Sequence, residues 1–123
     1  MEKKQILVIG LEPDLVDFSA MPDLNATKVR AGLEVDKARL ATLGYEAELC
    51  LTDLGATAQA VVAQKLSERS FDCVVIGAGI RTIPAHFLLF EKLVNVVHRG
   101  APAARLCFNT KPSDTAEAVQ RWV

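Results

Sequence analysis

Four short runs of apolar residues stand out along the chain, and each has the length of a strand. They cover residues 5–10 (QILVIG), 46–52 (EAELCLT), 72–77 (DCVVIG) and 104–109 (ARLCFN). Continuous apolar runs of this length are typical of strands that are buried on both faces of a sheet. The pattern therefore predicts four strands.

Segments with the period of an amphipathic helix separate these runs. Helices are expected over residues 25–44, 56–69, 84–99 and 113–123. Gly44 stands where a left-handed C-terminal cap is expected. Asp114, with Glu117 three residues later, predicts a capping box for the last helix, whose Val119 and Trp122 should point inward.

Strand and helix alternate four times, without a repeat or a candidate linker. This order predicts one α/β domain over residues 1–123, with a doubly wound, four-stranded parallel sheet and helices on both faces. We expect the flavodoxin-like or Rossmann-like strand order 2-1-3-4. It places the first and third strands, which are the two most apolar, side by side in the middle.

Composition and charge argue against several classes of partner. The chain has 14 basic and 15 acidic residues, so it has no overall field to attract nucleic acid. The longest apolar stretch, residues 87–97, is interrupted by polar residues and is too short to span a membrane. The first residues lack the pattern of a signal peptide. We therefore expect a cytoplasmic protein that binds neither nucleic acid nor membrane.

The three cysteines lie inside apolar runs. Cys50, Cys73 and Cys107 have no Cys-x-x-Cys spacing, and no histidine cluster accompanies them. Cysteines in such positions behave as small buried apolar side chains. We expect no zinc site or other metal site and no disulfide framework.

A ligand site is expected where the winding of the sheet reverses, between the carboxyl ends of the first and third strands. After the first strand, Gly10 and Glu12 open an acidic stretch that reaches residue 25 and contains no basic residue. Loops of this length are often functional or disordered. The stretch is either a solvated acidic loop, pinned to the sheet by its apolar residues, or a lid or metal-holding segment.

After the third strand, Gly77 and Gly79 are followed by Arg81 and Thr82 at the start of a helical segment. Glycines that admit an anion to the backbone, an arginine and a helix start suit a small anion or a mononucleotide. The same glycines also suit a plain tight turn. The stretch VIGAGI resembles the opening of flavin- and nicotinamide-binding loops over six residues, but it lacks the third glycine and the later ribose-binding acid.

Three further polar residues fall near this edge of the predicted sheet. His86 lies on the apolar stripe of its helix, where it is either a hydrogen-bonded core residue or an acid, base or ligand contact. Asn109 and Thr110 follow the fourth strand. They either complete a polar rim or form the turn before the last helix.

The helix over residues 84–99 has a wider apolar face than one side of a small sheet needs. Phe87, Phe90, Val94 and Val97 contribute to this face, whereas Leu88 lies on the polar side. Exposed apolar patches usually mark interfaces. We therefore expect a homodimer through this helix.

At three places the chain resembles a response-regulator receiver domain. KKQILVIGLE is similar to the opening strand and acidic turn of that family, FDCVVIGAGI to the strand that ends in the phosphate-accepting aspartate, and TKPSDTAEAV to the lysine-proline turn. The resemblance implies the same sheet and matches Lys111 to the functional lysine. Gly10 and Leu11 replace the acidic pair, of which only the following Glu12 remains, and Gly77 replaces the aspartate. It therefore implies a receiver-like domain that forms no aspartyl phosphate.

The usual catalytic motifs are absent, including the triphosphate-binding loop, the Gly-x-Ser-x-Gly elbow and an Asp-x-Asp pair after the first strand. We expect a non-catalytic or regulatory module that binds a small anionic metabolite. The alternative is a small enzyme acting on a phosphorylated or carboxylated substrate, with Arg81 holding the anion and His86 or Glu12 moving a proton. A pure scaffold is a third possibility. The sequence indicates no particular cofactor.

Overall fold

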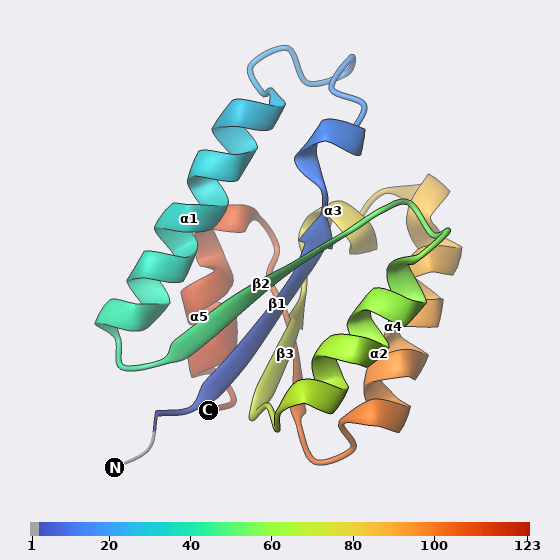
Figure 1. Ribbon diagram of the computed structural model, residues 1–123. Coiled ribbons are helices and arrows are strands. Elements are labelled where there is room, and N and C mark those ends of the chain that lie inside the picture. The colour runs from blue at the N-terminus through green and yellow to red at the C-terminus, as the bar shows by residue number, and fades with distance from the viewer. Residues whose placement is uncertain (1–2) are drawn as a thin grey trace.

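A four-stranded parallel sheet forms the centre of the computed structural model, which describes residues 3–123 (Figure 1). The strands are β1 (Gln5–Leu11), β2 (Glu46–Thr52), β3 (Cys73–Ile76) and β4 (Arg105–Phe108). They follow the order β2-β1-β3-β4, and every pairing is parallel. The predicted α/β flavodoxin-like fold and its strand order are therefore confirmed.

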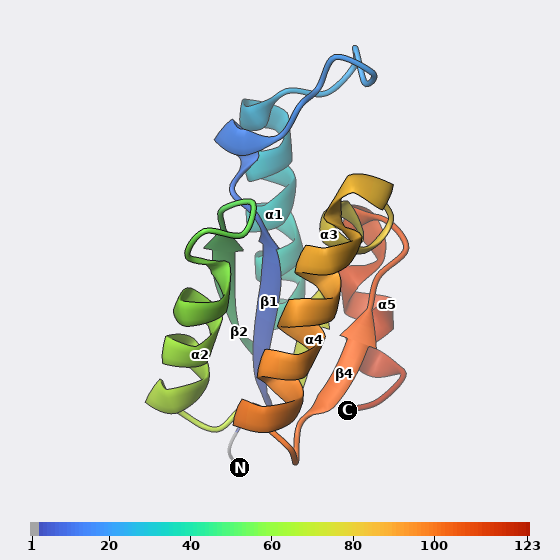
Figure 2. The ribbon, with the colours of Figure 1, turned by 90° about the vertical axis from the view of Figure 1, so that its right-hand side faces the viewer.

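Helices cover both faces of this sheet. The α-helices are α1 (Ala26–Thr42), α2 (Ala58–Glu68), α3 (Ala78–Arg81), α4 (Phe87–Gly100) and α5 (Thr115–Gln120), and the 3-10 turns are η1 (Pro13–Leu15), η2 (Pro84–His86) and η3 (Pro112–Asp114). α2 and α4 lie on one face, and α1 and α5 lie on the other (Figures 1 and 2). Within residues 3–123, none of the helices has the length and apolar character needed to cross a membrane.

Each face of the sheet contributes to its own apolar core. β1 directs Leu7 and Ile9 toward α2 and α4, and directs Ile6 and Val8 toward α1 and α5. β3 divides its side chains in the same way, and all four of its residues are fully buried. Alternate side chains of a strand point to opposite faces, so a strand with helices on both sides needs a continuous apolar run. This explains the runs that predicted the central strands.

The cysteines are buried as expected, but two of them are bonded. Cys73 of β3 and Cys107 of β4 form a disulfide, with their Cα atoms 6.7 Å apart, whereas Cys50 is a free thiol. The expectation of no disulfide is therefore wrong. The register pairs Cys73 with Arg105 and Val75 with Cys107, so both cysteines face the α1–α5 side, one diagonal step apart. Only the strand pairing brings these two residues together.

The segment after β3 differs from its prediction. The sequence predicts one helix over residues 84–99, whereas residues 84–86 form the 3-10 turn η2 and α4 begins at Phe87. The short helix α3 was not expected from the pattern. Val97 is 1% exposed and packs in the core against the sheet, so it does not contribute to a free apolar face. Phe87 and Leu88 are exposed.

The last helix also differs from its prediction. The Asp114 carboxylate accepts the backbone N–H of Thr110 and does not cap α5, so the predicted capping box is wrong. Glu117 instead forms an ion pair with Arg39 of α1. Trp122 is 55% exposed, not inward, because α5 ends before it. These differences arise from contacts with distant or preceding residues that compete with the local helix pattern.

One glycine inside α1 and one just after it give a matched test of local backbone conformation. Gly44 follows the helix with φ +95°, as predicted, whereas Gly32 lies inside the helix, and an added Cβ would meet no atom within 4 Å at either position. We expect Gly44→Ala to lower the free energy of unfolding by about 1 kcal/mol, because a Cβ strains the left-handed conformation. We expect Gly32→Ala to raise it by about 0.5–1 kcal/mol. Urea unfolding measures both changes, and equal signs would contradict this account.

Candidate functional site

The carboxyl ends of β1 and β3 lie side by side, as the proposed site requires. Ile9 of β1 is paired with Ile76 of β3, and the N–H of the following residue, Gly77, donates to the Ile9 carbonyl at 2.9 Å. Gly10 lies at the same level of the sheet, paired with Leu51 of β2. β1 is therefore flanked by β2 on one side and β3 on the other, so this edge is the point at which the winding reverses.

Apolar side chains occupy the space under this edge. Leu11 is 7% exposed and Ile80 of α3 is fully buried, and both belong to the core beneath α2 and α4. A Cβ at Gly77 would lie 3.2 Å from the Ile9 carbonyl oxygen, so this glycine permits the close approach of the two chains. A Cβ at Gly79 would meet no atom within 4 Å. The turn is thus tight at Gly77 and open beside Gly79.

Asn109 joins the turn after β3 to the helices on the other face. Its Oδ1 accepts the Ala78 N–H at 2.8 Å, and its Nδ2 donates to the Thr115 hydroxyl at 2.9 Å. The side chain is buried and its polar atoms are engaged. The Thr115 hydroxyl in turn donates to the Asp36 carboxylate of α1 at 3.4 Å. Asn109 therefore fixes α3 relative to β4, α5 and α1.

Arg81 is held at the same edge by the end of β4. Its Nη2 donates to the Asn109 carbonyl at 2.6 Å, and the guanidinium carbon lies 5.9 Å from the centroid of the Phe108 ring. Its Nε is buried and has no hydrogen-bond partner among residues 3–123. Within this part of the chain, no carboxylate forms an ion pair with Arg81. The site thus carries a positioned positive charge that no carboxylate of residues 3–123 neutralises.

Glu12 is engaged away from Arg81. Arg30 of α1 pairs with Glu12 at 2.5 Å and with Asp14 at 3.0 Å. The acidic stretch after β1 therefore finds its compensating charge on the helix that follows it, which the sequence analysis missed. Val16, Phe18 and Met21 of this stretch are partly buried, and Leu15 is 45% exposed.

Thr82 and His86 bond to their own turn. The Thr82 hydroxyl donates to the Ala78 carbonyl at 2.6 Å, and His86 Nδ1 lies 3.3 Å from the Gly79 carbonyl. His86 belongs to η2 and is partly exposed, so it is not a buried residue of the α4 stripe. The carbonyl beside His86 is part of the open turn that follows β3.

Thr110 forms a local turn with Asp114. The Thr110 hydroxyl and backbone N–H both donate to the Asp114 carboxylate. Although partial burial opposes ionisation of Asp114, these bonds hold the pKa of its carboxyl below the ordinary value. Of the nine predicted site residues, the structure brings Gly77, Gly79, Arg81 and Asn109 together, with Gly10, Thr82 and His86 nearby, whereas Glu12 and Thr110 have other partners.

Asp36 is a polar residue of this region that the sequence analysis missed. Burial raises the pKa of its carboxyl above the ordinary value, although the Thr115 hydroxyl and Arg39 act in the opposite direction. No local signal identifies Asp36, because Thr115 lies 79 residues away. The arrangement becomes visible only when α1 and α5 pack on the same face.

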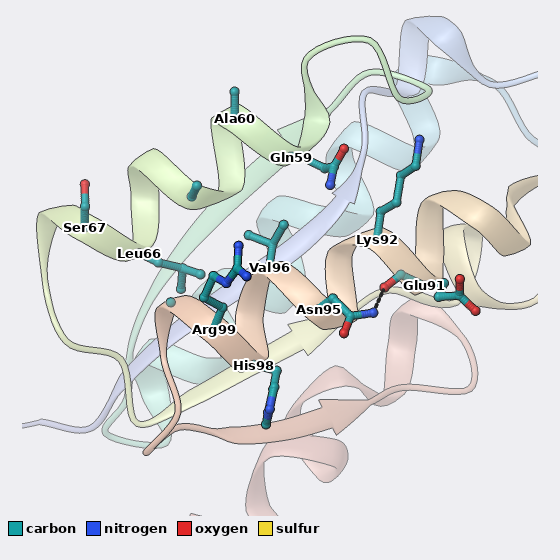
Figure 3. Close-up of a pocket in the computed structure, with 12 residues that line it drawn as sticks. Gln59, Ala60, Leu66, Ser67, Glu91, Lys92, Asn95, Val96, His98 and Arg99 are labelled. Carbon is teal, nitrogen blue, oxygen red and sulfur yellow. Dashed lines mark hydrogen bonds between the residues drawn. The ribbon is translucent and has the colours of Figure 1, made fainter.

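A groove of about 740 Å³ lies elsewhere, along the outer side of α2 and α4 (Figure 3). Its lining includes Gln59, Ala60, Leu66 and Ser67 of α2 and Glu91, Lys92, His98 and Arg99 of α4. Figure 3 shows Lys92 directed toward α2 and His98 directed away from it. Within residues 3–123, no group of three or more His, Cys, Asp or Glu side chains is arranged to hold a metal ion.

Comparisons with known proteins do not assign a family. No protein-family model matches the chain, and no curated protein matches it. What the protein does is therefore inferred from its own geometry. The two features that carry most weight are the charge of Arg81, which has no carboxylate partner within the described part of the chain, and the Asn109 carbonyl that holds its guanidinium.

Replacement of Asn109 tests its role as the structural link of the site. We expect Asn109→Leu to lower the free energy of unfolding by about 2 kcal/mol, because the buried Ala78 N–H loses its acceptor and Thr115 loses a donor. The matched control is Gln64→Leu, which removes an exposed amide from α2. It should change stability by less than about 0.5 kcal/mol. Equal effects of the two replacements in urea unfolding would contradict the proposed link.

Removing the charge of Asp36 and removing that of Asp53 should have opposite effects on the stability of the fold. Because burial raises the pKa of Asp36, its ionised form destabilises the fold above the ordinary carboxyl range. Asp36→Asn should therefore increase stability at pH 7, and the gain should vanish below about pH 4. The Gly55 N–H and the Thr57 hydroxyl lower the pKa of Asp53, so Asp53→Asn should decrease stability at pH 7 and lose this effect as the pH falls. Thermal unfolding between pH 3 and 8 measures both signs, and a gain from Asp53→Asn would contradict them.

Proposed function

We propose that the protein is a non-catalytic, regulatory module that binds a small anionic metabolite at the carboxyl ends of β1 and β3. The observation that carries the proposal is the guanidinium of Arg81, which has no carboxylate partner among residues 3–123. In sheets of this order, ligands bind where the winding reverses. The proposed ligand supplies the counter-ion that residues 3–123 do not provide for Arg81.

The contacts of Arg81 suit a carboxylate or phosphate group. Stacking on Phe108 and the bond from Nη2 to the Asn109 carbonyl restrict the plane of the guanidinium before any ligand arrives. A planar guanidinium binds such anions through two parallel N–H bonds. The open space beside Gly79 leaves room for a small group next to the turn. These features support an anion of small size.

The catalytic alternative receives less support from the same contacts. Proton transfer needs a free acid or base within hydrogen-bond reach of the bound substrate. Glu12 is paired with Arg30, and His86 Nδ1 is close to the Gly79 carbonyl. Neither side chain contacts Arg81. A binding function therefore accounts for the geometry with fewer assumptions than an enzymatic one.

We also propose that the protein forms a homodimer through α4. Phe87 is 64% exposed, and Phe90 and Val94 of α4 are only partly buried. Leu106 and Phe108 of β4 are likewise partly buried, and the Phe108 ring contacts Phe90 edge-on. Exposed apolar surface of this kind is stabilised by a partner that covers it. Val97 makes no contribution, because it lies in the core.

Anion binding is tested by thermal unfolding in phosphate and in citrate at constant ionic strength, with chloride as the reference. We expect either anion to stabilise the wild type, by about 2.7 kcal/mol when its concentration is 100 times the dissociation constant. Arg81→Gln should abolish this shift, because the amide cannot replace the charge of the guanidinium. Arg81→Lys should retain part of it, since it keeps the charge without the planar donor pair.

The matched control is Arg99→Gln on α4. Arg99 is exposed and borders the groove with α2, far from the carboxyl edge of the sheet, whereas Arg81 is partly buried. This variant should keep the full stabilisation by phosphate and citrate. Loss of the shift in both variants would indicate a nonspecific charge effect. Absence of any shift in the wild type with either anion would contradict the proposed binding function.

A further inference from the structure

The first turn of α4 lies at the same edge of the sheet as Arg81. α4 connects the parallel strands β3 and β4, so it runs antiparallel to them and begins at their carboxyl ends. His86, the residue before Phe87, has its Nδ1 3.3 Å from the Gly79 carbonyl, and α3 packs against both η2 and α4. Figure 2 shows α3 beside the end at which α4 begins. The start of α4 therefore borders the turn that contains Arg81.

The ring of Phe108 links Arg81 to α4. The guanidinium carbon of Arg81 lies 5.9 Å from the centroid of this ring, and Phe90 of α4 contacts the ring edge-on at a centroid distance of 6.0 Å. Both phenylalanines are only partly buried. The positive charge of Arg81 therefore adjoins aromatic surface.

Phe87 extends this aromatic pair toward the carboxyl edge. Residues three apart on an α-helix lie about 60° apart around its axis and about 4.5 Å apart along it. Phe87 is therefore on the same side of α4 as Phe90, one turn nearer to the edge that carries Arg81, and its side chain is 64% exposed. Leu88 is 58% exposed but lies about 160° from Phe90 around the axis. Of these two residues, Phe87 is the one on the side of Phe108.

We infer that the anion bound by Arg81 carries an apolar body, an aryl or alkyl group, that packs against Phe87. This inference rests on the function proposed above and specifies its class of ligand. An inorganic anion would pair with the guanidinium and leave Phe87 in water, whereas an organic phosphate or carboxylate covers the ring with its apolar body at the same time. Contact between aromatic rings is favourable beyond the area that it buries. Arg81 thus fixes the charged group, and Phe87 favours ligands with an apolar body.

Methyl phosphate and phenyl phosphate share the anionic group and differ in the apolar body, so they test this class of ligand. Calorimetric titration of the wild type at constant ionic strength should give a dissociation constant about tenfold smaller for phenyl phosphate. Phe87→Ala should reduce this preference to less than about threefold, with the affinity for methyl phosphate unchanged. Leu88→Ala, the matched control, should keep the full preference. Arg81→Gln should abolish binding of both compounds.

The outcomes separate this inference from the function on which it rests. Equal binding of the two compounds by the wild type would contradict the class of ligand and leave the Arg81 site standing, whereas binding of neither would contradict the proposed function itself. The proposed homodimer is another cover for Phe87, so sedimentation velocity of Phe87→Ala is measured alongside. A variant that loses the dimer but keeps the preference for phenyl phosphate would assign the ring to the subunit interface and overturn the inference.

Discussion

The parallel pairing of β1 with β3 is the constraint on which the layers of the molecule and the candidate site depend. The two strands run side by side from Ile6 and Cys73 to Ile9 and Ile76, and these residues are fully buried. Apolar strands of this kind are shielded from water only if helices cover both faces of the sheet. The sheet is therefore the middle of three layers. The same pairing brings the Gly77 N–H to the Ile9 carbonyl and places the following turn at the carboxyl edge. The proposed anion site depends on that one close approach.

Some charged side chains at this edge form ion pairs, whereas Arg81 forms none with residues 3–123. Glu12 and Asp14 are neutralised by Arg30, so the acidic stretch after β1 is compensated within its own strand–helix unit. Arg81 instead donates a hydrogen bond to a backbone carbonyl and stacks on an aromatic ring. These contacts use some of its N–H donors but do not neutralise its positive charge. Hydrogen bonds to neutral groups orient a guanidinium without neutralising it. This contrast is the physical basis for proposing that an anion binds at Arg81.

The features that the sequence predicts are those set by local patterns. Continuous apolar runs identified the strands, and glycine after α1 identified the helix end. The features that it missed depend on residues that are distant in the chain: Asn109 bonds to Ala78 31 positions away, and Cys73 bonds to Cys107 34 positions away. Asp114 shows the competition directly, since the turn with Thr110 takes the carboxylate that the local pattern assigns to a helix cap. The periodicity of a sequence reports local structure, so it does not predict such contacts.

The proposed anion site and the proposed dimer surface share one side chain. Phe108 lies under the guanidinium of Arg81 and also contacts the ring of Phe90, so a single ring touches both regions. Close-packed side chains transmit displacement to their neighbours, so a shift of this ring on binding of the proposed anion would reach Phe90 of α4. Linkage then makes the effect reciprocal: if an anion strengthens dimerisation by some factor, dimerisation strengthens anion binding by the same factor. A regulatory module needs such a connection between its ligand and its partner, and the position of Phe108 supplies a physical route for it.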